Sequence, residues 1–137
     1  MSDGARPRIL IVEDEWLIAD LLEAMLDELG YDAVGPASSV QEALELIQEQ
    51  AVDAALLDVS LGRVRSYPVA EALMRAGTPF LFLTGYIDGD LPAQFRSAPV
   101  LCKPVSLVEL KAPLEQLVLT DARARSEKTS TDVSLSR

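Results

Sequence analysis

Histidine is absent from the 137-residue sequence, and cysteine occurs once, at Cys102. Without histidine, the chain can form neither a histidine-based catalytic triad nor a histidine metal site, and it cannot itself donate a phosphoryl group from a phosphohistidine. A single cysteine excludes an internal disulfide bond and an all-cysteine zinc site. The side chains left for chemistry are mainly carboxylates, hydroxyls and amines.

Basic residues are also few, because 12 lysines and arginines accompany 22 aspartates and glutamates, for a net charge of −10. DNA and anionic membranes repel such a chain, so we expect no nucleic acid and no membrane as a partner. The longest apolar runs, residues 9–12 and 80–83, are far shorter than the ~20 residues of a membrane-spanning helix. The polar residues 1–8 do not resemble a signal peptide. We therefore expect a cytoplasmic protein.

Apolar segments bounded by charged or turn residues predict five β-strands, at residues 8–12, 31–34, 52–57, 79–83 and 100–102. Apolar residues at helical spacing predict helices at residues 15–29, 40–47, 68–77 and 107–119, with a short one at 91–96. Strands that alternate with helices pair in parallel and are covered on both faces. The expected fold is α/β, a five-stranded parallel sheet that is doubly wound in the flavodoxin-like (βα)5 manner.

This pattern stops at Thr120, after which the chain is rich in Ser, Thr, Arg and Lys. We expect one domain over residues 7–119 and a disordered tail over residues 120–137. A tail of this length is too short to fold into a further domain.

Polar residues follow four of the predicted strands. The first strand ends in Glu13 and Asp14, the third in Asp58, the fourth in Thr84 and the fifth in Lys103. The carboxyl ends of parallel strands lie at one edge of a sheet, where such folds bind ligands. Three carboxylates gathered there repel one another unless a cation enters, and Mg²⁺ prefers such oxygen ligands. One carboxylate could then act as a nucleophile toward phosphorus, with the lysine neutralising phosphoryl oxygens.

Each of these residues also has a purely structural explanation. Glu13 and Asp14 could cap a helix, Asp58 and Thr84 could be turn residues, and Lys103 could lie in a solvated loop. Because all of them fall at strand ends that share one edge, a functional site explains the set better than separate coincidences.

Four segments resemble the receiver domain of two-component response regulators: ILIVEDE (9–15), ALLDVSLG (55–62), PFLFLTGY (79–86) and VLCKP (100–104). The resemblance implies phosphorylation on an aspartate by a histidine kinase or histidine phosphotransferase, with Mg²⁺. It implies that Asp58 is the phosphoacceptor. Asp14, Asp58 and the Ser60 carbonyl would bind Mg²⁺ directly, and Glu13 would bind it through water. The resemblance further implies that Thr84 supplies the switch hydroxyl and that Lys103 pairs with the phosphoryl group. It also implies a cis bond before Pro104.

Two positions depart from the usual receiver pattern. Val100 stands where most receivers have an aromatic switch residue, and Leu83 stands where the similar FAT GUY receivers have alanine. Tyr86 is a candidate substitute switch, although it could equally be a loop tyrosine with no such role. A stand-alone receiver would signal by a surface change that other proteins read, and it would not be an enzyme beyond slow autodephosphorylation.

Two alternatives remain open from the sequence. A Mg²⁺-dependent aspartyl phosphatase usually carries Asp-x-Asp after the first strand, and Glu13-Asp14-Glu15 does not match this signature. A phosphorylation-independent adaptor would not need the complete set of Asp58, Thr84 and Lys103.

Overall fold

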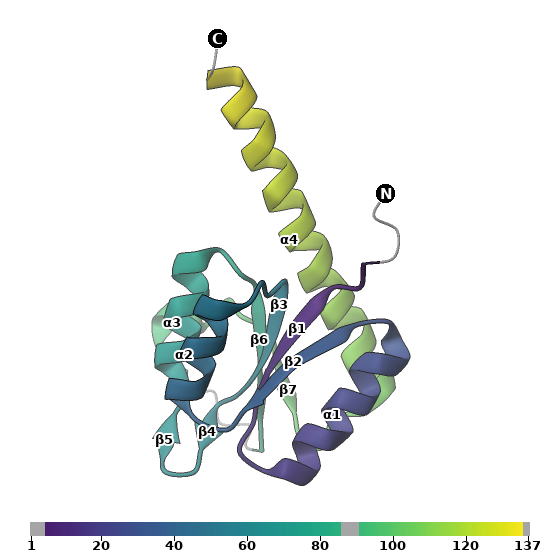
Figure 1. Cartoon of the computed structure of the whole chain (residues 1–137). Coiled ribbons are helices and arrows are strands. Elements are labelled where there is room, and N and C mark those ends of the chain that lie inside the picture. The colour runs from purple at the N-terminus through teal and green to yellow at the C-terminus, as the bar shows by residue number, and fades with distance from the viewer. Residues whose placement is uncertain (1–4, 86–90, 136–137) are drawn as a thin grey trace.

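Five parallel strands form the centre of the computed structural model. The structure describes residues 5–85 and 91–135, and it describes side chains only up to residue 121. The strands are β1 (Arg8–Val12), β2 (Asp32–Ala37), β3 (Ala54–Asp58), β6 (Phe80–Thr84) and β7 (Val100–Cys102). Their order in the sheet is β2-β1-β3-β6-β7 (Figure 1). The expected α/β doubly wound fold is therefore confirmed.

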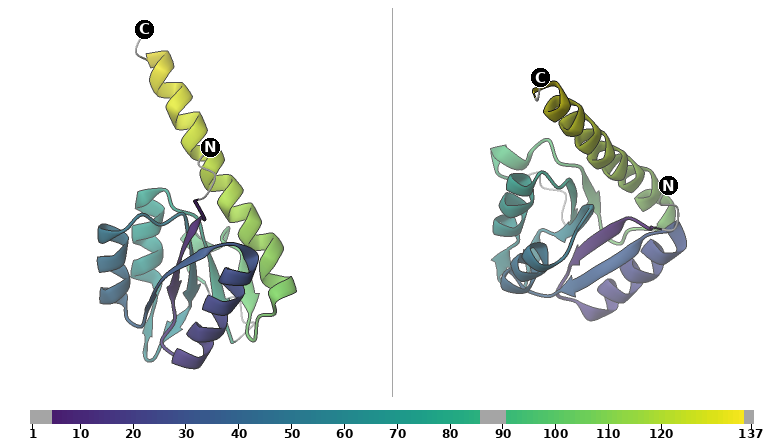
Figure 2. Two further views of the ribbon diagram at one scale, coloured as in Figure 1. Left: turned by 45° about the vertical axis from the view of Figure 1, so that its right-hand side comes forward. Right: turned by 45° about the horizontal axis from the view of Figure 1, so that its top comes forward.

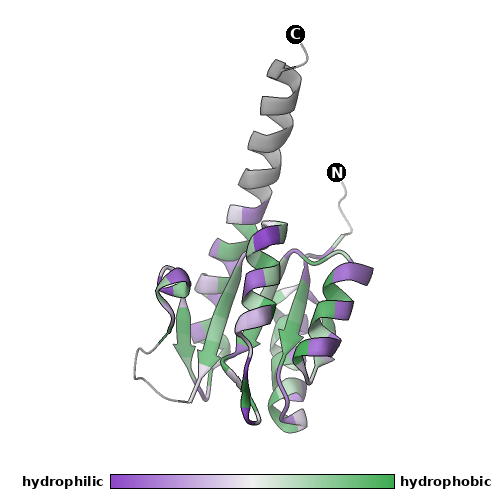
Figure 3. Cartoon of the chain, turned by 90° about the vertical axis from the view of Figure 1, so that its left-hand side faces the viewer, coloured by the Kyte–Doolittle hydropathy of each residue, from purple (hydrophilic) through white to green (hydrophobic). Residues whose placement is uncertain are grey.

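Helices cover both faces of this sheet. They are α1 (Trp16–Leu29), α2 (Val40–Glu49), α3 (Tyr67–Ala76) and α4 (Leu107–Leu135). Leucines of α1 and α4 pack with Ile9 and Ile11 on one face, while α2 and α3 pack with Leu10 and Val12 on the other (Figure 2). Alternate residues of the inner strands thus enter two different cores, which is why these strands are apolar without interruption. Figure 3 shows the hydrophobic strands enclosed by helices with hydrophilic outer sides.

Hydrogen bonds at the helix ends explain where two of the helices begin. The Glu42 N–H donates to Ser39 Oγ at 3.1 Å, and Ser39 is the N-cap of α2. Ser106 and Glu109 form a reciprocal capping box, because each backbone N–H donates to the other's side chain, at 3.0 and 3.1 Å. Both caps follow the Ser-x-x-Glu spacing that is typical of a capping box, and each satisfies N–H groups that have no partner within the helix.

Three elements differ from the sequence expectation. Residues 62–65, whose glycine and arginines indicated a loop, belong to a hairpin of two short antiparallel strands, β4 (Ser60–Leu61) and β5 (Val64–Arg65). The expected short helix at 91–96 is a single 3₁₀ turn, η1 (Ala93–Phe95). Helix α4 continues to Leu135 and projects beyond the sheet in place of a disordered tail (Figure 1). Residues 120–135 contain neither Gly nor Pro, so an existing helix can propagate through them without new nucleation.

Gly35 in β2 should resist substitution more strongly than Gly30 at the end of α1. Both have a positive φ, +96° and +95°, but a Cβ on Gly35 would lie 2.8 Å from Ala37 N, whereas a Cβ on Gly30 meets nothing within 4 Å. We expect Gly35→Ala to lower the free energy of unfolding by ~3 kcal/mol and Gly30→Ala by ~1 kcal/mol, since only the first adds a steric clash to the φ strain. Urea unfolding followed by circular dichroism measures both, and equal losses would contradict the prediction.

Candidate functional site

The strand register brings the predicted site residues to one edge of the sheet. Val12 pairs with Leu57, so Glu13, the next residue after β1, lies beside Asp58 at the end of β3. Thr84 pairs with Cys102, and the Lys103 N–H donates to the Thr84 carbonyl at 2.8 Å. The side chains therefore come from separate segments of the chain that meet only after the parallel sheet has formed.

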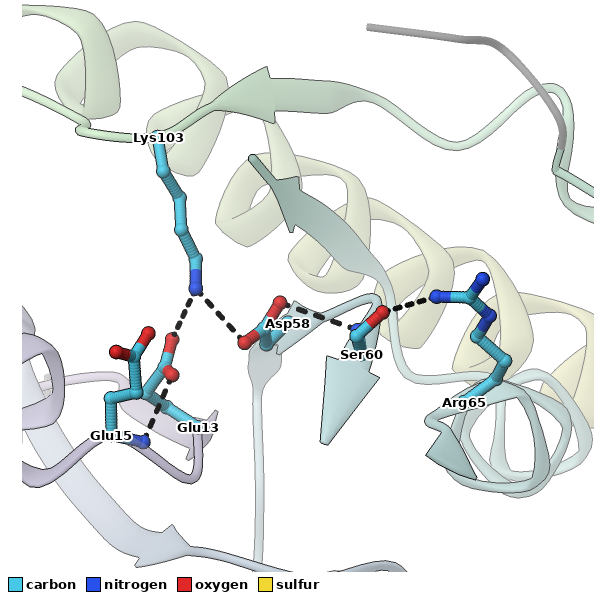
Figure 4. Close-up of polar contacts among 6 residues, drawn as sticks. All are labelled: Glu13, Glu15, Asp58, Ser60, Arg65 and Lys103. Carbon is cyan, nitrogen blue, oxygen red and sulfur yellow. Dashed lines mark hydrogen bonds and ion pairs between the residues drawn. The ribbon is translucent and has the colours of Figure 1, made fainter. Parts of the chain in front are cut away.

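The Lys103 ammonium joins two of these carboxylates. Its Nζ lies 2.9 Å from Asp58 Oδ2 and 3.0 Å from Glu13 Oε1 (Figure 4). All three side chains are largely buried. The Lys103–Pro104 peptide bond is cis, as the resemblance implied.

Backbone amides bind the remaining oxygens of the two carboxylates. The Ser60 N–H donates to Asp58 Oδ1 at 3.3 Å, and the Glu15 N–H donates to Glu13 Oε2 at 3.1 Å (Figure 4). Each oxygen of Asp58 thus faces one donor, the ammonium on one side and a peptide N–H on the other. This arrangement fixes the orientation of the carboxylate before any ligand binds.

Burial changes the acid–base properties of this cluster. Desolvation raises the pKa of Glu13 from 4.5 to about 7, and nearby Asp58 adds to the rise, against the lowering effect of hydrogen bonds from Glu15 and Lys103. Burial by itself would lower the pKa of Lys103, but its contacts with Asp58 and Glu13 outweigh this and raise it. The ammonium therefore stays charged, while burial disfavours the charged form of Glu13, which a further cation would favour.

The donor set fits a hard divalent cation. Glu13, Asp14 and Asp58 each offer a carboxylate oxygen, and these oxygens all lie within 4.8 Å of one another. Asp14 is exposed, so one side of the cluster remains open to solvent. Mg²⁺ takes oxygen ligands and keeps several waters, which suits a site that has few carboxylates and one open side.

Two other residues predicted for the site, Thr84 and Tyr86, are not part of the acidic cluster. Thr84 is half-buried at the end of β6, and its backbone carbonyl accepts the hydrogen bond from the Lys103 N–H. Tyr86, the candidate switch residue, lies outside the residues that the structure describes.

Sequence reasoning missed Arg65. Its Nη1 donates a hydrogen bond to Ser60 Oγ, which places a guanidinium next to the residue that binds Asp58 (Figure 4). A signal was present in the sequence, because Gly62-Arg63 between Leu61 and Val64 is typical of a two-residue hairpin turn. Such a turn would have placed Arg65 opposite Ser60.

Replacing Lys103 with methionine should destabilise the metal-free protein in a pH-dependent way. Between pH 4.5 and about 7 the native state keeps a proton on Glu13 that the unfolded chain has already lost. The free energy of unfolding therefore falls as the pH rises through this window. Loss of Lys103 removes a contact that lowers the Glu13 pKa, so it extends the window upward. We expect a loss of ~3 kcal/mol at pH 8 and a much smaller loss at pH 5.

Urea unfolding in the presence of EDTA at both pH values checks this prediction. Lys111→Met, which removes the same charge from an exposed position on α4, is the matched control and should change stability by less than ~0.5 kcal/mol. Equal losses at pH 5 and pH 8 would show that the titration of Glu13 does not cause the effect.

Comparisons with known proteins agree with this geometry. Residues 9–115 match the family model of the response regulator receiver domain. The transcriptional regulatory protein PdtaR of Mycobacterium tuberculosis is 37% identical over an alignment of 122 residues, and the match covers 85% of this chain and 60% of PdtaR. The regulator PhyR of Methylorubrum extorquens is 31% identical over an alignment of 122 residues, and the match covers 85% of this chain and 45% of PhyR. The chain thus spans 60% or less of the length of these two relatives.

A solved structure is similar over nearly all of its length. The BeF3-activated conformation of SdrG from Pseudomonas melonis Fr1 is 43% identical, with a TM-score of 0.72, and the match covers 84% of this chain and 98% of SdrG. Within the described residues, no helix is both long enough and apolar enough to span a lipid bilayer. The matched family model covers most of the sheet and the acidic cluster, and the chain belongs to the response regulator receiver domain family.

Proposed function

We propose that this response regulator accepts a phosphoryl group on Asp58 from a histidine kinase or histidine phosphotransferase, with Mg²⁺ bound beside it. The observation that carries the proposal is the position of Lys103, whose Nζ bridges Asp58 and Glu13 next to the exposed carboxylate of Asp14. A cation on one side and an open acidic cluster on the other suit a dianionic phosphoryl group that arrives with a divalent ion.

The transfer forms one bond and breaks one. An oxygen of Asp58 attacks phosphorus, the phosphorus–nitrogen bond of the donor phosphohistidine breaks, and the imidazole nitrogen keeps the electron pair and takes up a proton. The product is an acyl phosphate on Asp58. Because this chain contains no histidine, the phosphohistidine must belong to another protein.

Other residues of the site would bind the phosphoryl group, orient the carboxylate and hold Mg²⁺. Lys103 Nζ is placed to pair with a phosphoryl oxygen, and the Ser60 N–H is placed to orient the carboxylate. Asp14 and Asp58 would hold Mg²⁺ with the Ser60 carbonyl, and Glu13 would act through water. When bound, Mg²⁺ would offset the repulsion between the carboxylates and polarise the phosphoryl group.

The output is a change of surface that other proteins read. We infer that the Thr84 hydroxyl donates a hydrogen bond to the phosphoryl group. This contact would favour one conformation of the segment after β6 over another. Similarity to SdrG and PhyR supports a place in the FAT GUY subgroup, in which Tyr86 would take part in the switch. We further propose that the protein acts in the cytoplasm, and its net charge of −10 disfavours direct binding to nucleic acid or to an anionic membrane.

Incubation with acetyl phosphate and Mg²⁺, followed by intact mass measurement, tests the proposal. We expect one adduct of about 80 Da, the mass of one phosphoryl group carried as an acyl phosphate. The adduct should be absent when EDTA replaces Mg²⁺, and hydroxylamine should remove it, because acyl phosphates react with hydroxylamine and serine or threonine phosphates do not. Failure of both acetyl phosphate and phosphoramidate to give an adduct would overturn the proposal.

A further inference from the structure

The hairpin after the phosphoacceptor places a second cation at the site. Ser60 and Arg65 are directly opposite each other in the β4–β5 pair, so their side chains emerge on the same face of the hairpin. A shift of one residue in this pairing would turn Arg65 to the other face. The contact between Arg65 Nη1 and Ser60 Oγ is therefore set by the register of the hairpin (Figure 4).

The hairpin is anchored at several points around the acidic cluster. Leu61 is buried in the core against α3, and the Ser66 N–H donates to the Val59 carbonyl at 2.9 Å, which closes the base of the hairpin. At the turn, a Cβ added to Gly62 would lie 3.9 Å from Asp14 Oδ2, so the turn lies close to the carboxylate expected to bind Mg²⁺. The hairpin thus forms a fixed wall of the site from which Arg65 extends.

Among the contacts with described residues, the Arg65 guanidinium has N–H groups that donate to no acceptor. A guanidinium has five N–H groups in a planar fork, and within the described part of the chain Arg65 makes one hydrogen bond, to Ser60 Oγ. Ser60 in turn donates its backbone N–H to Asp58 Oδ1, so Arg65 and Asp58 lie on either side of one residue. The exposed Arg65 side chain can therefore present N–H groups to a ligand bound at Asp58.

The charge balance of the site leaves room for such a donor. Glu13, Asp14 and Asp58 accompany one ammonium, that of Lys103, and Lys103 already contacts two of the carboxylates. A phosphodonor is itself an anion that approaches a chain of net charge −10. A guanidinium fork matches the oxygens of a phosphoryl group and binds them in a bidentate manner better than an ammonium does.

We propose that Arg65 is a phosphoryl-binding residue that recruits the anionic phosphodonor to Asp58 and then contacts the phosphoryl oxygens. This inference rests on the proposed function and adds to it a residue with a defined role. Ser60 Oγ holds Nη1 of the guanidinium beside the residue whose backbone N–H binds Asp58, and a ligand bound at Asp58 could take over this donor.

Matched arginine variants of the hairpin test the role of Arg65. The rate of adduct formation is measured by intact mass at increasing acetyl phosphate concentration for Arg65→Gln, Arg65→Lys and Arg63→Gln. Arg63 is an exposed neighbour in the same hairpin, so its replacement removes the same charge. We expect Arg65→Gln to lower the second-order rate constant about tenfold or more, since a charge-assisted hydrogen bond is lost. Arg65→Lys should recover part of the rate, and Arg63→Gln should stay within about twofold of the unmodified protein.

A spectroscopic measurement on the unmodified protein does not depend on the folding of any variant. With Mg²⁺ and beryllofluoride, a stable mimic of the phosphoryl group, the ¹H–¹⁵N signal of Arg65 Nε should shift and become protected from solvent exchange, and that of Arg63 should not. An unchanged Arg65 signal, or equal rates for Arg65→Gln and Arg63→Gln, would overturn this inference while adduct formation on the unmodified protein still supports the proposed function. Absence of any adduct would instead overturn the proposed function.

Discussion

Asp58→Asn is expected to abolish the phosphoryl adduct altogether. The asparagine amide has nearly the same shape and can still accept the hydrogen bond from the Ser60 N–H, but it lacks the anionic oxygen that attacks phosphorus. The substitution also removes one of three neighbouring carboxylates, so it relieves repulsion at the site, and the protein should stay folded. Intact mass after incubation with acetyl phosphate and Mg²⁺ measures the loss, and circular dichroism confirms the fold.

Asp20→Asn provides the matched control for this experiment. Asp20 is exposed on α1, and its replacement removes the same charge without touching the acidic cluster. This variant should form the adduct at the rate of the unmodified protein. A hydroxylamine-sensitive adduct on Asp58→Asn, in an amount equal to that of Asp20→Asn, would show that another carboxylate is the acceptor.

Phe95→Ala should cause one of the largest losses of stability in the molecule, about 3–5 kcal/mol. Phe95 is 1% exposed although it belongs to a single 3₁₀ turn. Its ring centroid lies 5.5 Å from that of Tyr67, 5.8 Å from that of Phe82 and 6.4 Å from that of Phe80. Truncation would leave a cavity inside this aromatic cluster and remove the contacts that hold the segment before β7.

Urea unfolding measures this loss against Val108→Ala. Val108 is 83% exposed on α4, so its truncation leaves no buried cavity and should change the free energy of unfolding by less than ~0.5 kcal/mol. A loss below ~1 kcal/mol for Phe95→Ala would mean that the segment around η1 contributes little to the fold. Domains of this size are stable by only ~5–15 kcal/mol, so the expected loss is a large share of the total.

The packing of Phe95 was not visible in the sequence. Residues 85–97 have few apolar positions and no helical periodicity, so the sequence predicted a weak segment with at most a short helix. In the structure, one aromatic side chain fixes this turn through contacts with β6 and α3, which are separated from it along the chain. Such contacts depend on which elements meet in space, and periodicity within a short segment does not report them.

Local pattern determined the architecture and the main residues of the candidate site. Uninterrupted apolar strands between amphipathic helices require a parallel sheet, and a parallel sheet places the ends of β1, β3, β6 and β7 at one edge. This edge accounts for the grouping of five residues from the sequence: Glu13, Asp14, Asp58, Thr84 and Lys103. Their roles in phosphoryl transfer remain predictions that the experiments above test.

Tertiary structure alone decided the burial of Glu13 and the position of Arg65. Glu13 is 2% exposed because neighbouring strands and Lys103 surround it, and this desolvation raises its pKa. Arg65 meets Ser60 because two strands of two residues each pair in one register, and segments this short carry no periodic signal. Sequence thus specifies which groups reach the edge of the sheet, whereas solvent exclusion and cross-strand pairing, which depend on distant neighbours, set their charge and orientation.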